Sequence, residues 1–199
     1  MSACTAFAGP NRIASGEKAQ VALAVKAVVA GGESAAILIF DNATSRLVEF
    51  DLRGTDQDVI ARLAPQAPSA ESEPPARGPG RPKLGVVSRE VTLLPRHWDW
   101  LNAQPGGASV AIRKLVEAAR KAGAGQDLVR QAQEAADRFM LAMAGNEPGY
   151  EDAARALYAG DAGKFAAITV GWPADVRDHA QMLAKAAFEP AAAVESVAD

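Results

Sequence analysis

Hydrophobic and polar positions change their spacing several times along the chain, and these changes predict three structured segments. The first, residues 1–64, is predicted to hold a strand at 5–8, a helix capped by Ser15 and ending near Gly31, a hairpin with strands at 36–40 and 46–52, and a short helix capped by Thr55. These alternating elements indicate a small α+β module. Its residues form no catalytic constellation, so we expect a folding or docking role.

The central segment, residues 86–122, is predicted to form a strand followed by two helices. Residues 86–94 have strand composition, Pro95 suits the first turn of a helix, and Ser109 is a candidate N-cap for a second helix that ends at Gly123. The second helix carries an apolar face, made of Ile112, Leu115, Val116 and Ala119. Because so short a helix pair cannot bury a core of its own, we expect a homodimer through residues 86–122.

The third segment, residues 123–189, reads as helical throughout. Helices are predicted around 128–142, 150–158, 164–169 and 173–188, with short glycine-bearing turns between them. Such turns favour a compact helical bundle. The last segment, residues 190–199, is small or acidic, and we expect a disordered tail. The fold class is therefore α+β: a small N-terminal α/β hairpin module, a central strand–helix–helix element and a C-terminal helical bundle.

Charge is distributed unevenly along the chain, although the net charge is only -3. Residues 1–76 carry 6 basic and 9 acidic side chains, residues 77–121 carry 9 and 3, and residues 122–199 carry 6 and 12. A basic middle between acidic flanks is typical of a nucleic-acid-binding segment on an otherwise acidic protein. The alternative is an ordinary solvated face.

A linker rich in proline and glycine, residues 65–85, separates the first two segments. Its sequence from Arg77 to Lys83 resembles the AT-hook, in which an extended arginine enters the narrow minor groove of A·T-rich DNA. Here Pro79 stands where that motif has its first arginine, which leaves Arg81 as the central contact. Arg77, Arg81 and Lys83 are therefore candidate DNA contacts, and a solvated basic linker is the alternative.

The strand, helix, glycine-rich turn and capped second helix of the central segment resemble the ribbon-helix-helix fold of small bacterial repressors. That resemblance implies two chains that pair their strands and insert the ribbon into the major groove, with the start of the second helix facing a phosphate. The implied DNA contacts are Arg89, Thr92, Arg96, Ser109, Arg113 and Lys114. Neither face of the strand carries a full set of polar side chains for reading bases, and DNA would repel Glu90. A strand–helix–helix element packed inside a larger fold is the alternative.

Three longer stretches, residues 39–53, 80–101 and 172–179, are similar to a bacterial family of uncharacterised proteins described only as a domain of unknown function. The resemblance covers nearly the whole chain. It implies a bacterial setting and supplies no catalytic residues.

Residues for catalysis or metal binding are few. The protein has 1 Cys and 2 His, without a second His or Cys at metal-ligand spacing, and it has no glycine-rich phosphate loop. No apolar run approaches the roughly 20 residues that cross a bilayer. We therefore expect no catalytic residues, no cofactor, no metal, no membrane partner and no identified small-molecule substrate, in a cytoplasmic protein. The predicted function is DNA binding, as a transcription regulator or nucleoid-associated factor; the alternative is a protein-interaction adaptor whose central segment is structural or dimerising.

Overall fold

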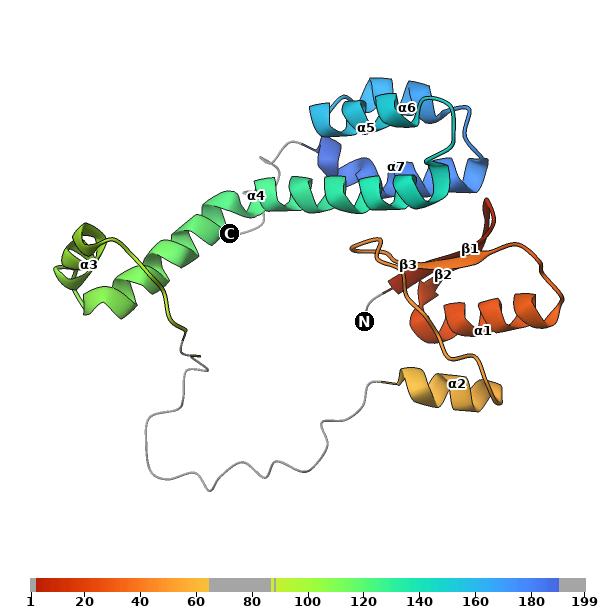
Figure 1. The fold of residues 1–199 in the computed structure, drawn as a ribbon, viewed down its shortest axis with the longest axis horizontal. Coiled ribbons are helices and arrows are strands. Elements are labelled where there is room, and N and C mark those ends of the chain that lie inside the picture. The colour runs from red at the N-terminus through yellow and green to blue at the C-terminus, as the bar shows by residue number, and fades with distance from the viewer. Residues whose placement is uncertain (1–2, 65–86, 88, 190–199) are drawn as a thin grey trace, which may run out of the picture. The chain divides into compact units, whose positions relative to one another are not determined.

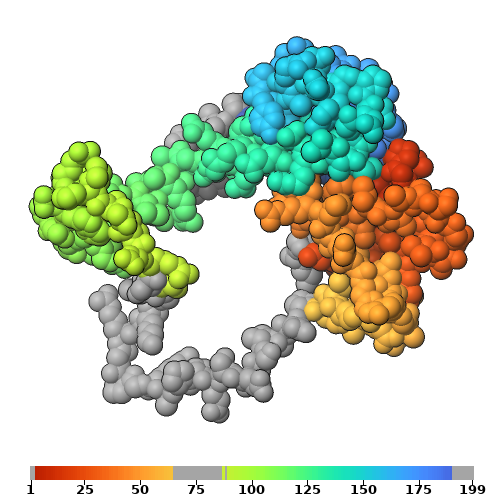
Figure 2. Space-filling model, in the orientation of Figure 1, coloured from red at the N-terminus to blue at the C-terminus, as the bar shows by residue number. Residues whose placement is uncertain are grey.

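The computed structural model describes residues 3–64, 87 and 89–189 and divides the chain into two compact units (Figures 1 and 2). Unit 1 consists of Met1–Ala64 with Ala124–Asp199, and unit 2 is Pro65–Gly123. The predicted linker and the predicted C-terminal tail lie outside the described residues. The described part is a mixed α+β structure that is mostly helical, with one small antiparallel sheet.

The sheet of unit 1 has three strands in the order β2-β1-β3, and all neighbours are antiparallel. A helix, α1, connects β2 to β3, and α2 follows the sheet with a capping box between Thr55 and Asp58. The bounds are β1 Ala3–Ala8, β2 Asn11–Glu17, α1 Lys18–Ala30, β3 Ile37–Asp41 and α2 Asp56–Leu63. The predicted strand at 5–8 and the cap at Thr55 are confirmed.

Two predictions in this module are wrong. Ser15 is not a helix cap but a residue of β2, where its hydroxyl lies 2.8 Å from the hydroxyl of Thr5 on β1. The expected strand at 46–52 is reduced to one bridge between Phe40 and Leu47. Past that bridge the apolar side chains of this segment pack against the core beneath the sheet instead of extending the ladder.

The helices of unit 1 enclose an aromatic cluster that connects them to the sheet. The ring of Phe7 on β1 lies 5.4 Å from Phe139 on α4 and 5.4 Å from His179 on α7, measured between centroids. Phe40 on β3 completes the cluster, 5.1 Å from Phe139. Sheet and helices therefore share one hydrophobic core. The helix bounds are α4 Gly107–Ala144, α5 Tyr150–Ala159, α6 Ala162–Thr169 and α7 Ala174–Phe188.

The glycine-bearing turns between these helices lie where the sequence predicts them. Gly149 and Gly160, at the two ends of α5, adopt left-handed φ angles of 78° and 72°, a conformation that favours glycine. The predicted helical bundle of the C-terminal segment is confirmed as helical structure.

Helix α4 departs from prediction, because it is one continuous helix of 38 residues. The sequence predicts that a first helix ends at Gly123 and that a second begins after it. The structure continues through Gly123 and Gly125, each of which costs about 1 kcal/mol relative to alanine in a helix interior. The alanine, lysine, arginine and glutamine residues around them are good helix formers, and they offset that cost.

Replacing Gly123 and Gly125 with alanine tests the continuity of α4. In a helix interior each change should increase helix content and stabilise the protein by roughly 0.5–1 kcal/mol. Far-UV circular dichroism and urea unfolding measure both effects. A loss of stability on Gly123→Ala would instead support a helix that ends there with a left-handed glycine.

His179 gives unit 1 a predictable dependence on pH. It is almost fully buried, and its Nε2 has no hydrogen-bond partner among the described residues. Burial, and secondly the positive charge of Arg12, lower the pKa of His179 to about 4. The unfolded chain, with a histidine pKa near 6.5, therefore binds a proton between about pH 6.5 and 4 that the folded protein does not.

The free energy of unfolding should consequently fall as pH decreases through that window, by at most about 1.4 kcal/mol per pH unit from this group. Urea unfolding of His179→Leu should show a shallower decline than the native protein between pH 6.5 and 4. His97→Gln, on the exposed surface of unit 2, is the control and should keep the native slope. Equal slopes for the native protein and His179→Leu would contradict this assignment.

Candidate nucleic-acid interface

The first helix of unit 2, α3 (Pro95–Asn102), begins where the sequence predicts it. Proline at the first helical position needs no amide hydrogen, and Leu94 before it is extended, at φ -66° and ψ 148°. The carbonyl of Leu94 accepts the amide hydrogens of His97 and Trp98, at 2.8 and 3.3 Å. Leu94 thereby fixes the direction in which the chain enters α3.

The turn between α3 and α4 depends on two glycines. Gly106 and Gly107 adopt φ angles of 86° and 74°, and a Cβ on Gly106 would lie 3.2 Å from the Val110 side chain. Helix α4 begins at Gly107, so the predicted cap at Ser109 is wrong and Ser109 lies in the first turn. The carbonyl of Ser109 accepts a hydrogen bond from Nε of Arg113, at 3.1 Å.

The predicted strand at 86–94 is not formed by its described residues, Val87 and 89–94. A strand requires a hydrogen-bonded neighbour, and the described part of the chain provides none for this segment. The odd-numbered side chains of the segment nevertheless line two depressions on the helix pair, and Glu90, Thr92 and Leu94 line neither. The segment thus lies over the helices with one face towards them.

The first depression, which we call the basic groove, has a volume of about 650 Å³ and lies at the start of α4. It brings together three of the predicted DNA contacts: Arg89 from the extended segment, and Ser109 and Arg113 from the first turns of α4. Ser109 and Arg113 are both exposed. Arginine side chains, a serine hydroxyl and the start of a helix are groups of the kind that bind phosphate oxygens, so the groove is a candidate phosphate site.

The second depression, which we call the apolar face, has a volume of about 410 Å³ and is lined by apolar side chains together with His97. Trp100, Leu115 and Val116 are 52%, 51% and 59% exposed there. Among the described residues of unit 2, only Leu101 and Ala111 are buried. Such a surface is a candidate for contact with a second apolar surface.

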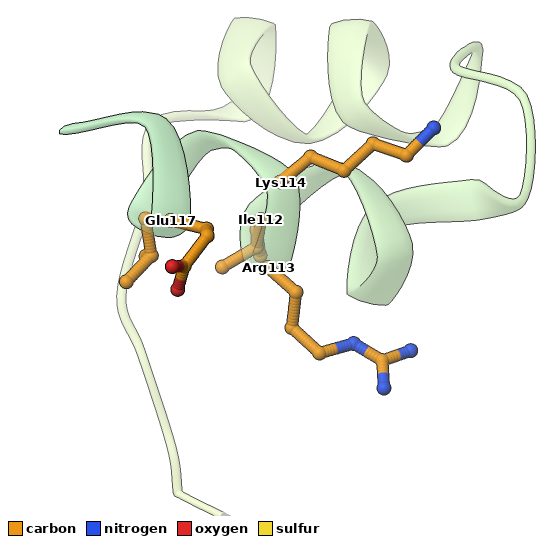
Figure 3. Close-up of a pocket in the computed structure, with 5 residues that line it drawn as sticks. Ile112, Arg113, Lys114 and Glu117 are labelled. Atoms are coloured by element: carbon orange, nitrogen blue, oxygen red, sulfur yellow. The ribbon is translucent and has the colours of Figure 1, made fainter. Parts of the chain in front are cut away.

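Lys114 and Glu117 lie beside these two surfaces on α4. Figure 3 shows that the side chains of Arg113 and Lys114 leave the helix in different directions. Glu117 pairs with Arg120 at 2.8 Å, and this hydrogen bond raises the pKa of Arg120. Arg120 therefore carries a partly compensated charge, whereas Arg113 bonds to a backbone carbonyl and pairs with no carboxylate among the described residues.

The remaining predicted contacts are not brought together with these. Thr92 and Arg96 are exposed but are not part of the basic groove, and Lys114 lies on another side of α4. Arg77, Arg81 and Lys83 lie outside the described residues. The spacing of two between Trp98 and Trp100 places the two rings on different sides of a short helix, so the sequence predicts that at least one of them is partly exposed or held by another module. Trp100 is 52% exposed, in agreement with this prediction.

No described helix is long and apolar enough to cross a membrane. Within residues 3–64, 87 and 89–189, no three His, Cys, Asp or Glu side chains gather as a metal site requires.

Comparison with known proteins gives one match. No curated protein and no solved structure shows significant similarity to the chain. A family model described as "Uncharacterized protein conserved in bacteria (DUF2239)" matches residues 3–184, and so covers both units. The chain therefore belongs to the DUF2239 family of bacterial proteins.

Proposed function

We propose that the protein binds DNA through unit 2 and does so as a self-associated pair. The observation that carries the proposal is the basic groove, where Arg89, Ser109 and Arg113 come together beside an uncovered apolar face. The groove offers phosphate contacts, and the apolar face offers a surface for a second copy. The order of extended segment, α3 and α4 supports a ribbon-helix-helix mode of pairing.

The distribution of charge supports unit 2 as the part that would attract DNA. Its described residues carry 6 basic and 3 acidic side chains, whereas those of unit 1 carry 12 basic and 17 acidic. Unit 1 should therefore oppose the approach of a phosphate backbone, and unit 2 should favour it. This division makes the affinity strongly dependent on the charges of a few side chains.

The outward face of residues 89–94 supports binding to phosphates more than reading of bases. Its side chains are Glu90, Thr92 and Leu94, which line neither depression. Only Thr92 is a common partner for base edges, and Glu90 accepts only from cytosine. The proposed contacts are therefore mainly to the DNA backbone, with little discrimination between sequences.

A two-fold axis between two copies that pack through their apolar faces would also determine where their basic grooves lie. By helical spacing, Ser109, Arg113 and Arg120 follow one flank of the α4 apolar stripe, and Ala111, Ala118 and Ala122 follow the other. If two copies pack α4 antiparallel about a two-fold axis, each flank meets its own equivalent. Both basic flanks then lie on the same side of the pair, which doubles the positive surface offered to one duplex.

A second candidate function, a protein-interaction adaptor without DNA binding, is favoured by the apolar face itself. Trp100 is half exposed, and tryptophan is enriched at protein interfaces. The dependence of binding affinity on salt concentration distinguishes the two candidate functions, because phosphate binding weakens steeply with ionic strength and apolar docking does not.

Charge removal in the groove should lower DNA affinity and its salt dependence together. Replacing Arg89 and Arg113 with alanine should flatten the slope of log K against log salt by about 0.9 for each phosphate that is no longer neutralised. The decrease in affinity should be similar for random and A·T-rich duplexes. Fluorescence anisotropy at several salt concentrations measures it.

The matched control replaces Arg130 and Lys185, two exposed cations of unit 1, with alanine. This control removes the same charge and should leave the slope close to that of the native protein. If the native protein shows no salt-sensitive binding to any duplex at low ionic strength, DNA binding is excluded and the adaptor function takes its place.

Self-association should depend on the apolar face. Leu115→Asp places a charge where a partner would bury it, so sedimentation velocity should show a shift to monomer. Leu128→Asp is the control, since Leu128 is equally exposed, at 51%, on the unit 1 part of α4. A native protein that is monomeric at micromolar concentration would contradict the pairing.

A further inference from the structure

A separate hollow in unit 1 has the chemistry of a ligand site. It has a volume of about 370 Å³ and lies between the turn after β3 and the last turns of α4. We call it the Ser45 pocket. Ser45, Arg46 and Leu47 line it from the turn, and Arg138 and Leu141 line it from α4.

The turn that forms one wall is held firmly by its own hydrogen bonds. One carboxylate oxygen of Asp41 accepts from the amides of Ala43 and Thr44, at 3.1 and 3.0 Å, and from the Thr44 hydroxyl at 3.0 Å. Ser45 donates its amide hydrogen to the Asp41 carbonyl at 2.7 Å. The wall is therefore preorganised.

Ser45 is unusual in two respects. It is the only non-glycine residue with a positive φ, at 51°, among those that the structure describes. Its side chain is buried, and its hydroxyl has no hydrogen-bond partner among the described residues. A strained residue with an unpaired buried hydroxyl costs stability, and both features gather at binding sites more often than elsewhere.

Two arginines at the pocket differ from most others in unit 1. Arg53, Arg62, Arg130, Arg155 and Arg177 each pair with a carboxylate. Within the described residues, neither Arg46 nor Arg138 has a carboxylate within 4.0 Å, and Arg138 donates to the carbonyl of Thr44 instead. Two arginines without a carboxylate partner among the described residues thus line one small hollow, in a unit whose described residues carry a net negative charge.

The rest of the pocket is apolar and open to solvent. Leu47 and Leu141 are 61% and 63% exposed on either side, and Phe40 lies buried beneath them. Exposed leucines on both sides of a hollow offer an aliphatic chain two surfaces to cover.

We propose that the Ser45 pocket binds a small aliphatic carboxylate. Its carboxylate pairs with Arg46 and Arg138, and its hydrocarbon chain lies between Leu47 and Leu141. The charges argue for an anion, and the volume suits a chain of medium length rather than a protein segment. The proposal concerns unit 1 alone and stands whether or not unit 2 binds DNA.

The test is a titration of the ¹⁵N-labelled full chain with octanoate, followed by amide chemical shifts. Saturable shifts should be confined to residues near 40–47 and 138–142. Octanol and octylamine, with the same chain and no carboxylate, should bind at least about tenfold more weakly. A titration with N-acetyl-leucine mimics the C-terminus of a peptide. Comparing its affinity with that of octanoate shows whether the pocket prefers the carboxylate of a free acid or that of a chain terminus.

Arg46→Gln and Arg138→Gln should each weaken octanoate binding by about tenfold or more. Arg155→Gln, an exposed arginine of unit 1 away from the pocket, is the matched control and should bind like the native protein. Arg138→Gln removes the hydrogen bond to the Thr44 carbonyl and could disturb the turn. In that case the binding measured for Arg46→Gln still tests the proposal. Equal binding of octanol, or shifts spread without saturation over the whole surface, would overturn the proposal.

Discussion

Unit 2 cannot bury its own apolar side chains, and the proposed function of the protein depends on this constraint. One helix of eight residues lies against the first turns of α4, and of the described residues only Leu101 and Ala111 are covered. Burying a large apolar side chain is worth roughly 1.5–3 kcal/mol. Leaving Trp100, Leu115 and Val116 exposed therefore gives a strong drive for another surface to cover them, and a second copy is the proposed one.

The same constraint explains why the basic residues of unit 2 lie where they do. Along α4, a position that faces the apolar stripe cannot carry an unpaired charge once a partner covers it. Arg113 lies beside the stripe and Lys114 lies on another side of α4, and both are exposed. The proposed packing and the proposed phosphate binding would thus use different sides of one helix, and neither would restrict the other. Arg120 differs because Glu117 already partly compensates its charge.

The sequence predicts those features that depend on neighbouring residues. Thr55 and Asp58 form a capping box three residues apart, and Gly149 and Gly160 bound α5 at its start and its end, so these elements are found where expected. Prediction from the sequence fails where pairing between residues far apart in the chain determines the local structure. Ser15 has the composition of a cap, but β1 pairs with it and makes it part of a strand. The basic groove combines Arg89 with Arg113 through a tertiary approach that no local spacing reveals. The helix end predicted at Gly123 is wrong for another reason, because glycine both ends helices and is tolerated inside them.

The proposed pairing of two copies would also explain how an acidic protein could bind DNA. A single unit 2 offers a small excess of positive charge, and unit 1 opposes it. In the proposed pair, two units on one side of a two-fold axis would act on the same duplex, so the second contact would form at a high effective concentration. Contacts that are weak singly would then combine, and at physiological salt exposed charges more than about 8–10 Å apart repel each other only weakly. On this proposal the apolar face would contribute to DNA affinity without touching DNA.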